Sequence, residues 1–339
     1  MNNLKLVDNN FEGGRHRNNA ISTIRLLAML MIILCHIFQF YNCILAWWFN
    51  VGVQIFLCVS GFLYGGKNID NVTQFYTNRI KKILVPYYLV LLAFAFFKFT
   101  FVRGEFNIKQ FMGSIILYST IKGAEHLWFI ATILMCYFIT PLLQLYRDAY
   151  IKNTKISWFK YLSLGIILIS IIFKLFIKFY NPAWIVCYFM GYAIGAKENS
   201  VIDKDNKFKI ILGLVALLVN VFQVFIKYYK NITFPGCDIL YDYNHVLLGV
   251  FIFILLKDFF TRLNMDKLYK ILRLSDKYSY EVYLVHQPLI LGSFSLLKLT
   301  DIDAVNILLV ILGIAILAII LKKIELKCYD CIEKRYSLL

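Results

Sequence analysis

The sequence has few charged residues and no long polar segment. Asp, Glu, Lys and Arg together make up 17% of its 339 residues, whereas a soluble domain has about 25%. Hydrophobic residues make up 60%, and the mean hydropathy is +0.67. No polar stretch between the apolar runs is long enough to form a second, soluble domain. These deficits predict an all-α, polytopic protein embedded in a lipid bilayer.

Acidic residues are scarce, with 20 Asp and Glu against 36 Lys and Arg, which gives a formal net charge of +16. A basic chain can bind nucleic acid. Here, however, about three quarters of the Lys and Arg residues lie in segments on one side of the membrane, if the predicted spans cross it alternately. This is the bias that the positive-inside rule describes. We therefore expect both termini in the cytoplasm and no nucleic-acid partner.

Several other signals are missing. No small-residue cleavage site follows the first apolar run, so we expect that run to be retained as a span. No internal repeat relates two parts of the chain. Cys328 and Cys331 form one CxxC pair without a second pair nearby. Zinc takes four ligands, so this pair is expected to be free thiols, and we expect no metal site.

About ten spans are predicted from the apolar runs. Residues 1–18 are expected to form a disordered cytoplasmic tail, 19–323 the membrane domain and 324–339 a second tail. We expect Pro86 to begin the third span, where its missing N–H costs nothing. Residues 103–125 are expected to form a longer loop, whose stretch FNIKQFMGSIILYST is too short to cross reliably and is expected to lie along the interface. The predicted spans are approximately 20–41, 47–66, 86–102, 126–146, 161–180, 183–196, 208–226, 243–260, 278–298 and 303–322.

Arg25 and His36 lie within the first span, where a bilayer core tolerates them badly. Eleven residues of helix give about 16 Å of rise and three turns plus about 20°, so both side chains share one face. Taken singly, Arg25 is interpreted as a snorkelling interfacial anchor and His36 as a packing residue. Together on one face of a span, they favour a functional site.

A second group of cations precedes the third span at its cytoplasmic end. Arg79 and Lys82 are three residues apart and share a face if the helix begins early, and Lys81 lies between them. Fixed positive charge at a cytoplasmic mouth suits a phosphate-bearing ligand. The alternative is that these residues only set topology.

Polar groups also mark the fourth and ninth spans. Glu125 and His126 stand at the outer start of the fourth span, where an interfacial cap is the alternative interpretation. The ninth span carries Glu281, Tyr283, His286 and Gln287, which we expect to face the protein interior. Pro288 has no N–H for the carbonyl of Leu284, so a kink is predicted beside this group.

The Arg25 and His36 pair resembles the first-helix motif of the acyltransferase family 3 membrane proteins, which O-acetylate bacterial surface glycans. The likeness extends in the family's order over about residues 20–300. Two departures are Lys82, where the family usually has Arg, and Gln54, where an acidic residue is common. The other similar segments are VGVQIFLCVSGFL at 51–63, RIKKILVPY at 79–87, HLWF at 126–129, Gly191-x-x-x-Gly195, and Ser279-Tyr280 leading to His286-Gln287-Pro288.

The resemblance implies transfer of an acyl group, here acetyl from acetyl-CoA, to a hydroxyl of a surface polysaccharide or its lipid-linked precursor at the bacterial cytoplasmic membrane. Arg25, Arg79 and Lys82 would hold the CoA phosphates. His36 would deprotonate the hydroxyl or relay a proton, and an acyl-His36 intermediate is the alternative. Arg25 and His36 are thus the expected catalytic pair. The expected acceptor or lining residues are Glu125, His126, Trp128, Ser60, Tyr283 and His286.

Two other classes of function remain open from the residues alone. Buried ionisable groups also mark transport pathways, so the chain could export a glycan or a lipid-linked sugar. The missing internal repeat argues against this, since many transporters have one. A structural partner in glycan assembly is the third interpretation, and it predicts that Arg25 and His36 can be replaced without effect.

Overall fold

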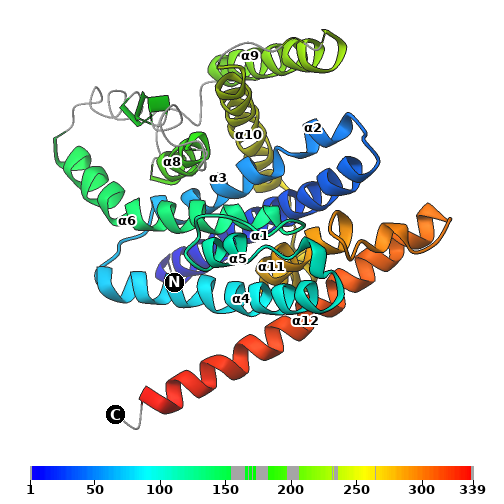
Figure 1. Ribbon diagram of the computed structural model, residues 1–339. Coiled ribbons are helices and arrows are strands. Elements are labelled where there is room, and N and C mark those ends of the chain that lie inside the picture. Colours follow the sequence, from blue (N-terminus) through cyan, green and yellow to red (C-terminus); the bar gives the residue numbers. More distant parts are fainter. Residues whose placement is uncertain are drawn as a thin grey trace. The chain divides into compact units, whose positions relative to one another are not determined.

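The computed structural model describes residues 2–153, 182–196, 206–230, 236–263 and 265–336, with a few isolated residues between these ranges. Every regular element in these ranges is a helix, so the all-α expectation is confirmed. Figure 1 shows the ribbon with the helices labelled. Contacts divide the chain into two units. The first comprises Met1–Ile32, Trp47–Asn68 and Leu142–Lys277, and the second Ile33–Ala46, Ile69–Pro141 and Tyr278–Leu339.

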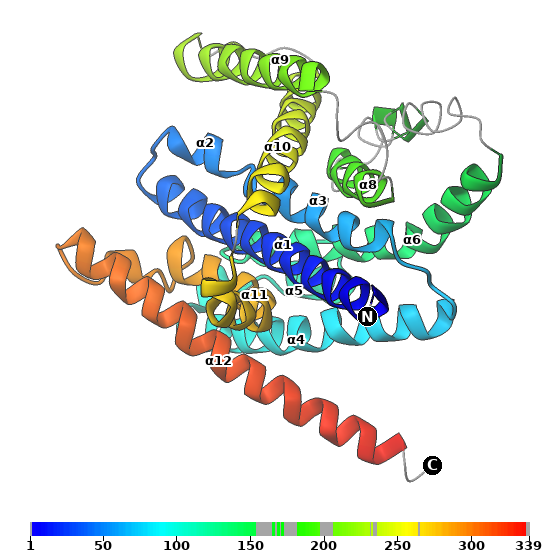
Figure 2. The same ribbon diagram turned by 180° about the vertical axis from the view of Figure 1, so that it is seen from behind.

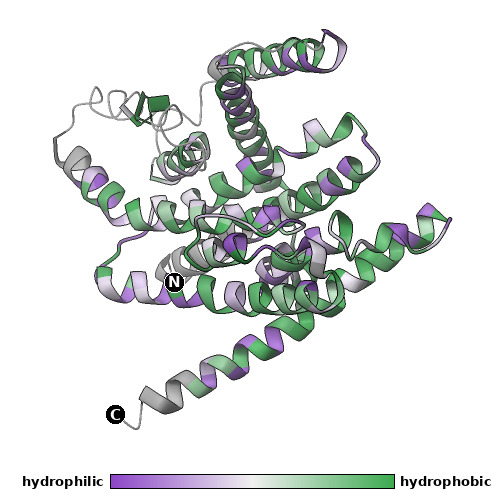
Figure 3. Ribbon diagram, viewed as in Figure 1, coloured by the Kyte–Doolittle hydropathy of each residue, from purple (hydrophilic) through white to green (hydrophobic). Residues whose placement is uncertain are grey.

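Seven helical segments in the described residues are long and apolar enough to cross a membrane. Figure 3 shows the apolar colouring along these helices, most continuously in the middle of α12 (Asp303–Tyr336). The predicted span 183–196 is the shorter helix α8 (Ala183–Ala196), and the predicted span 161–180 lies largely outside the described residues. The seven segments are Asn19–Phe40, Leu45–Gly65, Val72–Phe101, Glu125–Asp148, Lys209–Lys230, Cys237–Arg262 and Asp303–Cys331.

The first unit is built around helix α3 (Gly52–Gly65), which packs against α8 and α10 (Cys237–Arg262). Helix α9 (Asn206–Val224) packs against α10 and continues as a π-helical turn, Phe225–Lys230. The short helix α2 (Leu45–Phe49) precedes α3. Figure 2 shows α3, α8 and α10 from behind.

Glycines bring α3 and α8 into close contact. A Cβ atom on Gly61 would collide with the backbone carbonyl of Tyr188, and one on Gly191 would collide with the carbonyl of Cys58. Helices in membranes associate through such small residues because close backbone approach maximises packing. Gly195, one turn after Gly191, likewise meets the carbonyl of Phe62, so both glycines of α8 contact α3.

Gly61→Ala is expected to destabilise the first unit by about 1–3 kcal/mol, because backbone atoms cannot move aside for the methyl group. Thermal melting of the detergent-solubilised protein measures this loss. Gly104→Ala is the matched control, since a Cβ there meets nothing within 4 Å. Equal melting of both variants would show that the α3–α8 contact can relax.

The second unit contains α4 (Val72–Phe101), which packs against α5 (Ile108–Ile115) and α12. Short 3-10 turns, Arg103–Glu105, Glu125–Leu127 and Leu296–Lys298, connect its helices. Four helices contribute residues to both units: α1 (Asn2–Phe40), the short α2, α6 (Trp128–Asn153) and α11 (Tyr269–Ile290). The 3-10 turn Asp266–Leu268 precedes α11.

Three expectations about helix boundaries are wrong. Pro86 does not begin a helix, because α4 is capped by Asn71, whose side chain accepts the N–H of Gln74 at 2.9 Å, and Pro86 lies inside it. The first 18 residues are not a disordered tail: α1 starts at Asn2, since this proline-free segment extends an existing helix without new nucleation. The predicted span 278–298 is replaced by α11, whose polar residues leave it outside the seven apolar segments.

Candidate active site

Three histidines from distant parts of the sequence meet in the second unit. His36 lies near the end of α1, His126 in the turn before α6, and His286 on α11. The ring centroid of His286 is 5.1 Å from that of His36 and 4.9 Å from that of His126. His286 is completely buried and His126 is 4% exposed, whereas His36 is only partly buried. His36 is therefore the most exposed member of this group.

A backbone carbonyl one turn before Pro288 contacts His126. Proline has no N–H for the carbonyl of Leu284, and that carbonyl lies 3.1 Å from Nε2 of His126 instead. The side-chain oxygen of Gln287 accepts the backbone N–H of His126 at 2.7 Å and lies 2.6 Å from its Nδ1. Both edges of the His126 ring thus contact oxygen acceptors on α11. This residue is held in place by its neighbours on both sides.

Hydrogen bonds define the protonated nitrogen of the other two histidines. His286 Nδ1 lies 2.6 Å from the carbonyl oxygen of Tyr283, which can only accept, so Nδ1 carries the proton. Its Nε2 is buried without a hydrogen-bond partner. His36 Nδ1 lies 2.7 Å from Oε1 of Gln39. In both neutral rings, Nε2 is then the basic nitrogen.

Tyr283, also on α11, packs against the histidine group. Its hydroxyl donates to the backbone carbonyl of His126, and its ring lies 5.3 Å from the ring of His126 and 5.2 Å from that of Phe129. Glu281, His286 and Gln287 are also buried, at 1%, 0% and 5% exposure. The expectation that the polar side of α11 faces the protein interior is confirmed.

Glu125 and Trp128 lie beside the histidines in sequence but have separate contacts. Glu125 is exposed, and its carboxylate accepts the N–H of Gly123 at 2.8 Å. This contact is local to the turn and does not cap the 3-10 helix, whose N-cap residue is Ala124. Trp128 is partly buried, with its ring 5.8 Å from that of Phe129.

Arg25 and Ser60 belong to the first unit. Arg25 forms an ion pair with Asp276 at the start of α11, with 2.6 Å between Nη1 and Oδ1, and Ser22 donates to the other oxygen of Asp276. Ser60 donates to the carbonyl of Phe56 within α3, at 2.9 Å. The structure therefore places neither residue in the histidine group of the second unit.

Arg79, Lys81 and Lys82 lie in the N-terminal half of α4. Because α4 begins at Val72, Arg79 and Lys82 are both helical, as the three-residue spacing requires for a shared face. The Arg79 guanidinium lies 5.9 Å from the ring centroid of Phe75 and 5.7 Å from that of Tyr137. Lys81 and Lys82 are exposed.

Three histidines in one group raise the question of a metal ion. Across the described ranges, no set of three or more His, Cys, Asp or Glu side chains is arranged to hold one. Both ring nitrogens of His126 and Nδ1 of His286 face backbone or amide oxygens. The geometry of the group is that of hydrogen-bonded imidazoles.

Sequence reasoning missed two residues that contact the predicted ones. Gln39 follows His36 by one helical turn, a spacing that indicates side-chain contact. Asp276 pairs with Arg25 across 251 residues. In the sequence, Asp276 is marked only by its position in α11, the helix that also carries Glu281 and His286.

A family model described as an acyltransferase domain, Acyl_transf_3, matches residues 18–322, which include all three histidines. The chain belongs to the acyltransferase 3 family. The resemblance of the first helix, HLWF and the late motifs is thereby confirmed. Membership makes the protein a membrane acyltransferase with several membrane-spanning helices. No curated protein and no solved structure matches the chain significantly.

Proposed function

We propose that this member of the acyltransferase 3 family moves an acetyl group from acetyl-CoA to a hydroxyl of a cell-surface glycan or its lipid-linked precursor, in the bacterial cytoplasmic membrane. The observation that supports this most is His36. It is the partly exposed member of a buried histidine group, and its Nδ1–H bond to Gln39 leaves Nε2 as the base.

On this proposal, Nε2 of His36 removes the proton of the acceptor hydroxyl while the oxygen attacks the thioester carbonyl. A carbon–oxygen bond forms, the carbon–sulfur bond breaks, and the CoA thiolate leaves with the electron pair. The proton held by His36 is then available to the thiolate. His126, Tyr283 and His286 line the site and exclude water. Glu125 and Trp128 are assigned to the acceptor side.

On this proposal, cations on α4 bind the acyl donor. We give the CoA phosphates to Arg79 and Lys82, which lie three residues apart on one face of α4. Arg25, which forms an ion pair with Asp276, is given no phosphate. A guanidinium offers a fork to phosphate oxygens, and an ammonium adds a point charge. Ser60 donates within its own helix and is given no step in the transfer.

Membranes containing the protein should transfer radiolabel from acetyl-CoA to envelope glycan, in a form that mild alkali releases as acetate. Arg79→Ala should raise the KM for acetyl-CoA by about tenfold, the value of one charge-assisted contact. Lys109→Ala, which removes an exposed cation on α5, is the control. Labelling that does not depend on the protein would overturn the proposal and favour glycan export.

A further inference from the structure

Arg79, Lys81 and Lys82 lie on one turn of α4, which we call the basic turn. The helical hydrogen bonding of this turn is interrupted. Pro86 lies four residues after Lys82 and cannot donate the helical N–H to the Lys82 carbonyl. The backbone that carries Arg79 and Lys82 thus has one fewer internal hydrogen bond than an ordinary helix. A phosphate site needs its cations at fixed positions, so this turn requires support from outside α4.

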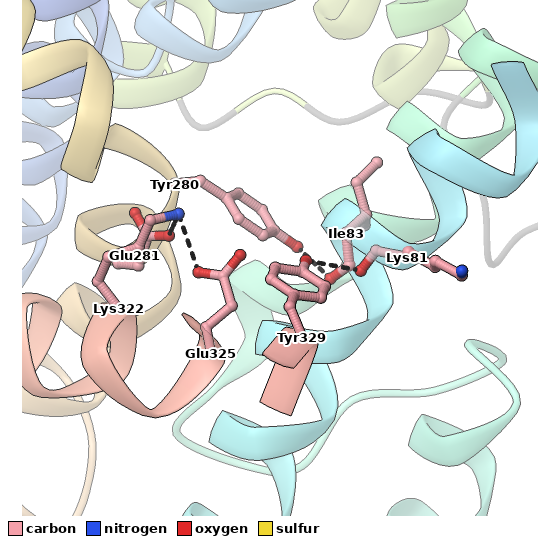
Figure 4. A network of polar contacts seen from close by, with 7 residues as sticks. All are labelled: Lys81, Ile83, Tyr280, Glu281, Lys322, Glu325 and Tyr329. Carbon is pink, nitrogen blue, oxygen red and sulfur yellow. Dashed lines mark hydrogen bonds and ion pairs between the residues drawn. The ribbon is translucent and has the colours of Figure 1, made fainter. Parts of the chain in front are cut away.

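Two tyrosine hydroxyls supply such support, as Figure 4 shows. Tyr280 on α11 donates to the carbonyl of Ile83 at 2.9 Å, and Tyr329 on α12 donates to the carbonyl of Lys81 at 3.1 Å. These two carbonyls are the immediate neighbours of Lys82. Residues from two other helices therefore hold the backbone on both sides of a proposed phosphate-binding lysine.

A buried ion triad fixes the helices that carry these tyrosines. Lys322 on α12 lies 2.9 Å from Glu281 of α11 and 3.0 Å from Glu325 of its own helix. Glu281 directly follows Tyr280, and Glu325 is one helical turn before Tyr329 (Figure 4). Both carboxylates are 1% exposed, and Lys322 is the cation that contacts each of them. The triad thereby sets the register of α12 against α11 beside both tyrosines.

We propose that Tyr280 and Tyr329 are positioning residues for the phosphates of the acyl donor. This inference rests on the proposed function, because it takes Arg79 and Lys82 as the phosphate ligands. The hydroxyls touch no substrate. They hold the turn of α4 so that the two cations point to the same phosphate group, and their loss weakens binding of a phosphate-bearing donor without slowing the chemical step.

The test compares two donors with the full-length protein. Acetyl-CoA carries the phosphates, and S-acetyl pantetheine has the same thioester without them. Tyr280→Phe and Tyr329→Phe should each raise the KM for acetyl-CoA by about three- to tenfold, the range expected for one buried hydrogen bond. The KM for S-acetyl pantetheine and both kcat values should stay as in the wild type.

Tyr88→Phe is the matched control, because the Tyr88 hydroxyl donates to the carbonyl of Ile115 at 2.9 Å, outside the basic turn. Suppose that Arg79→Ala raises the KM for acetyl-CoA and not that for S-acetyl pantetheine. If Tyr280→Phe and Tyr329→Phe then raise the KM equally for both donors, or raise neither, the inference is overturned. If the wild type and Arg79→Ala do not distinguish the donors, the phosphate site of the proposed function fails and the inference fails with it.

Discussion

Transfer to the acceptor hydroxyl falls by about two to four orders of magnitude when His36 is replaced by glutamine, the range expected for removal of a general base. Glutamine keeps a polar side chain of similar length but has no basic nitrogen. His36 is only partly buried, and its Nδ1–H contact with Gln39 leaves Nε2 to accept the proton. Initial rates with acetyl-CoA in membranes, at matched protein levels, measure this loss.

Two comparisons separate loss of the base from loss of structure. His245→Gln replaces another buried histidine, whose Nε2 lies 3.1 Å from the carbonyl of Trp47 in the first unit, and should leave the rate within about threefold. An acidic alcohol such as trifluoroethanol needs less help from a base, so it should partly restore transfer in His36→Gln. A His36→Gln rate within about tenfold of the wild type would remove His36 from the proton transfer.

Much of the active site could be predicted from residue types within single helices. The polar side of α11 was expected to face inward, and Glu281, His286 and Gln287 are buried. Pro288 predicted a carbonyl at Leu284 without its helical partner, and that carbonyl contacts His126. Such predictions succeed because a helix has a fixed geometry and a membrane penalises unpaired polar groups.

Pairings between helices could not be predicted in this way. His126 meets Gln287 across 161 residues, and Lys322 meets Glu281 across 41. Neither spacing corresponds to any helical period, so the partner is known only once the helices pack. The tautomers of His36 and His286 likewise depend on the acceptor beside each Nδ1. Sequence analysis therefore singled out the three histidines and missed the contacts that orient them.

The predictions of helix boundaries were wrong where one local signal was interpreted without the residues around it. Pro86 predicted a helix start, but Asn71 caps α4 fifteen residues earlier, and a proline can lie inside a membrane helix when neighbouring helices satisfy its backbone. The hydroxyls of Tyr280 and Tyr329 contact the carbonyls on either side of Lys82, whose own carbonyl lacks its helical donor. These are the residues to which we assign donor positioning.

Lys322→Met should destabilise the protein by about 3–5 kcal/mol, the cost of leaving buried charges without their partner. Glu281 and Glu325 are 1% exposed, and Lys322 is the cation that contacts both. Methionine fills a similar volume, so the change removes charge more than packing. The measurement is the midpoint of thermal unfolding in detergent, together with the yield of monodisperse protein.

Lys323→Met is the matched control, since Lys323 is the exposed neighbour on the same helix and its loss should shift the midpoint little. Adding Glu281→Gln and Glu325→Gln to Lys322→Met removes both orphaned charges and should recover most of the lost stability. If the triple variant melts as low as Lys322→Met, the loss comes from packing around Lys322, and the triad does not hold α11 and α12 together through charge.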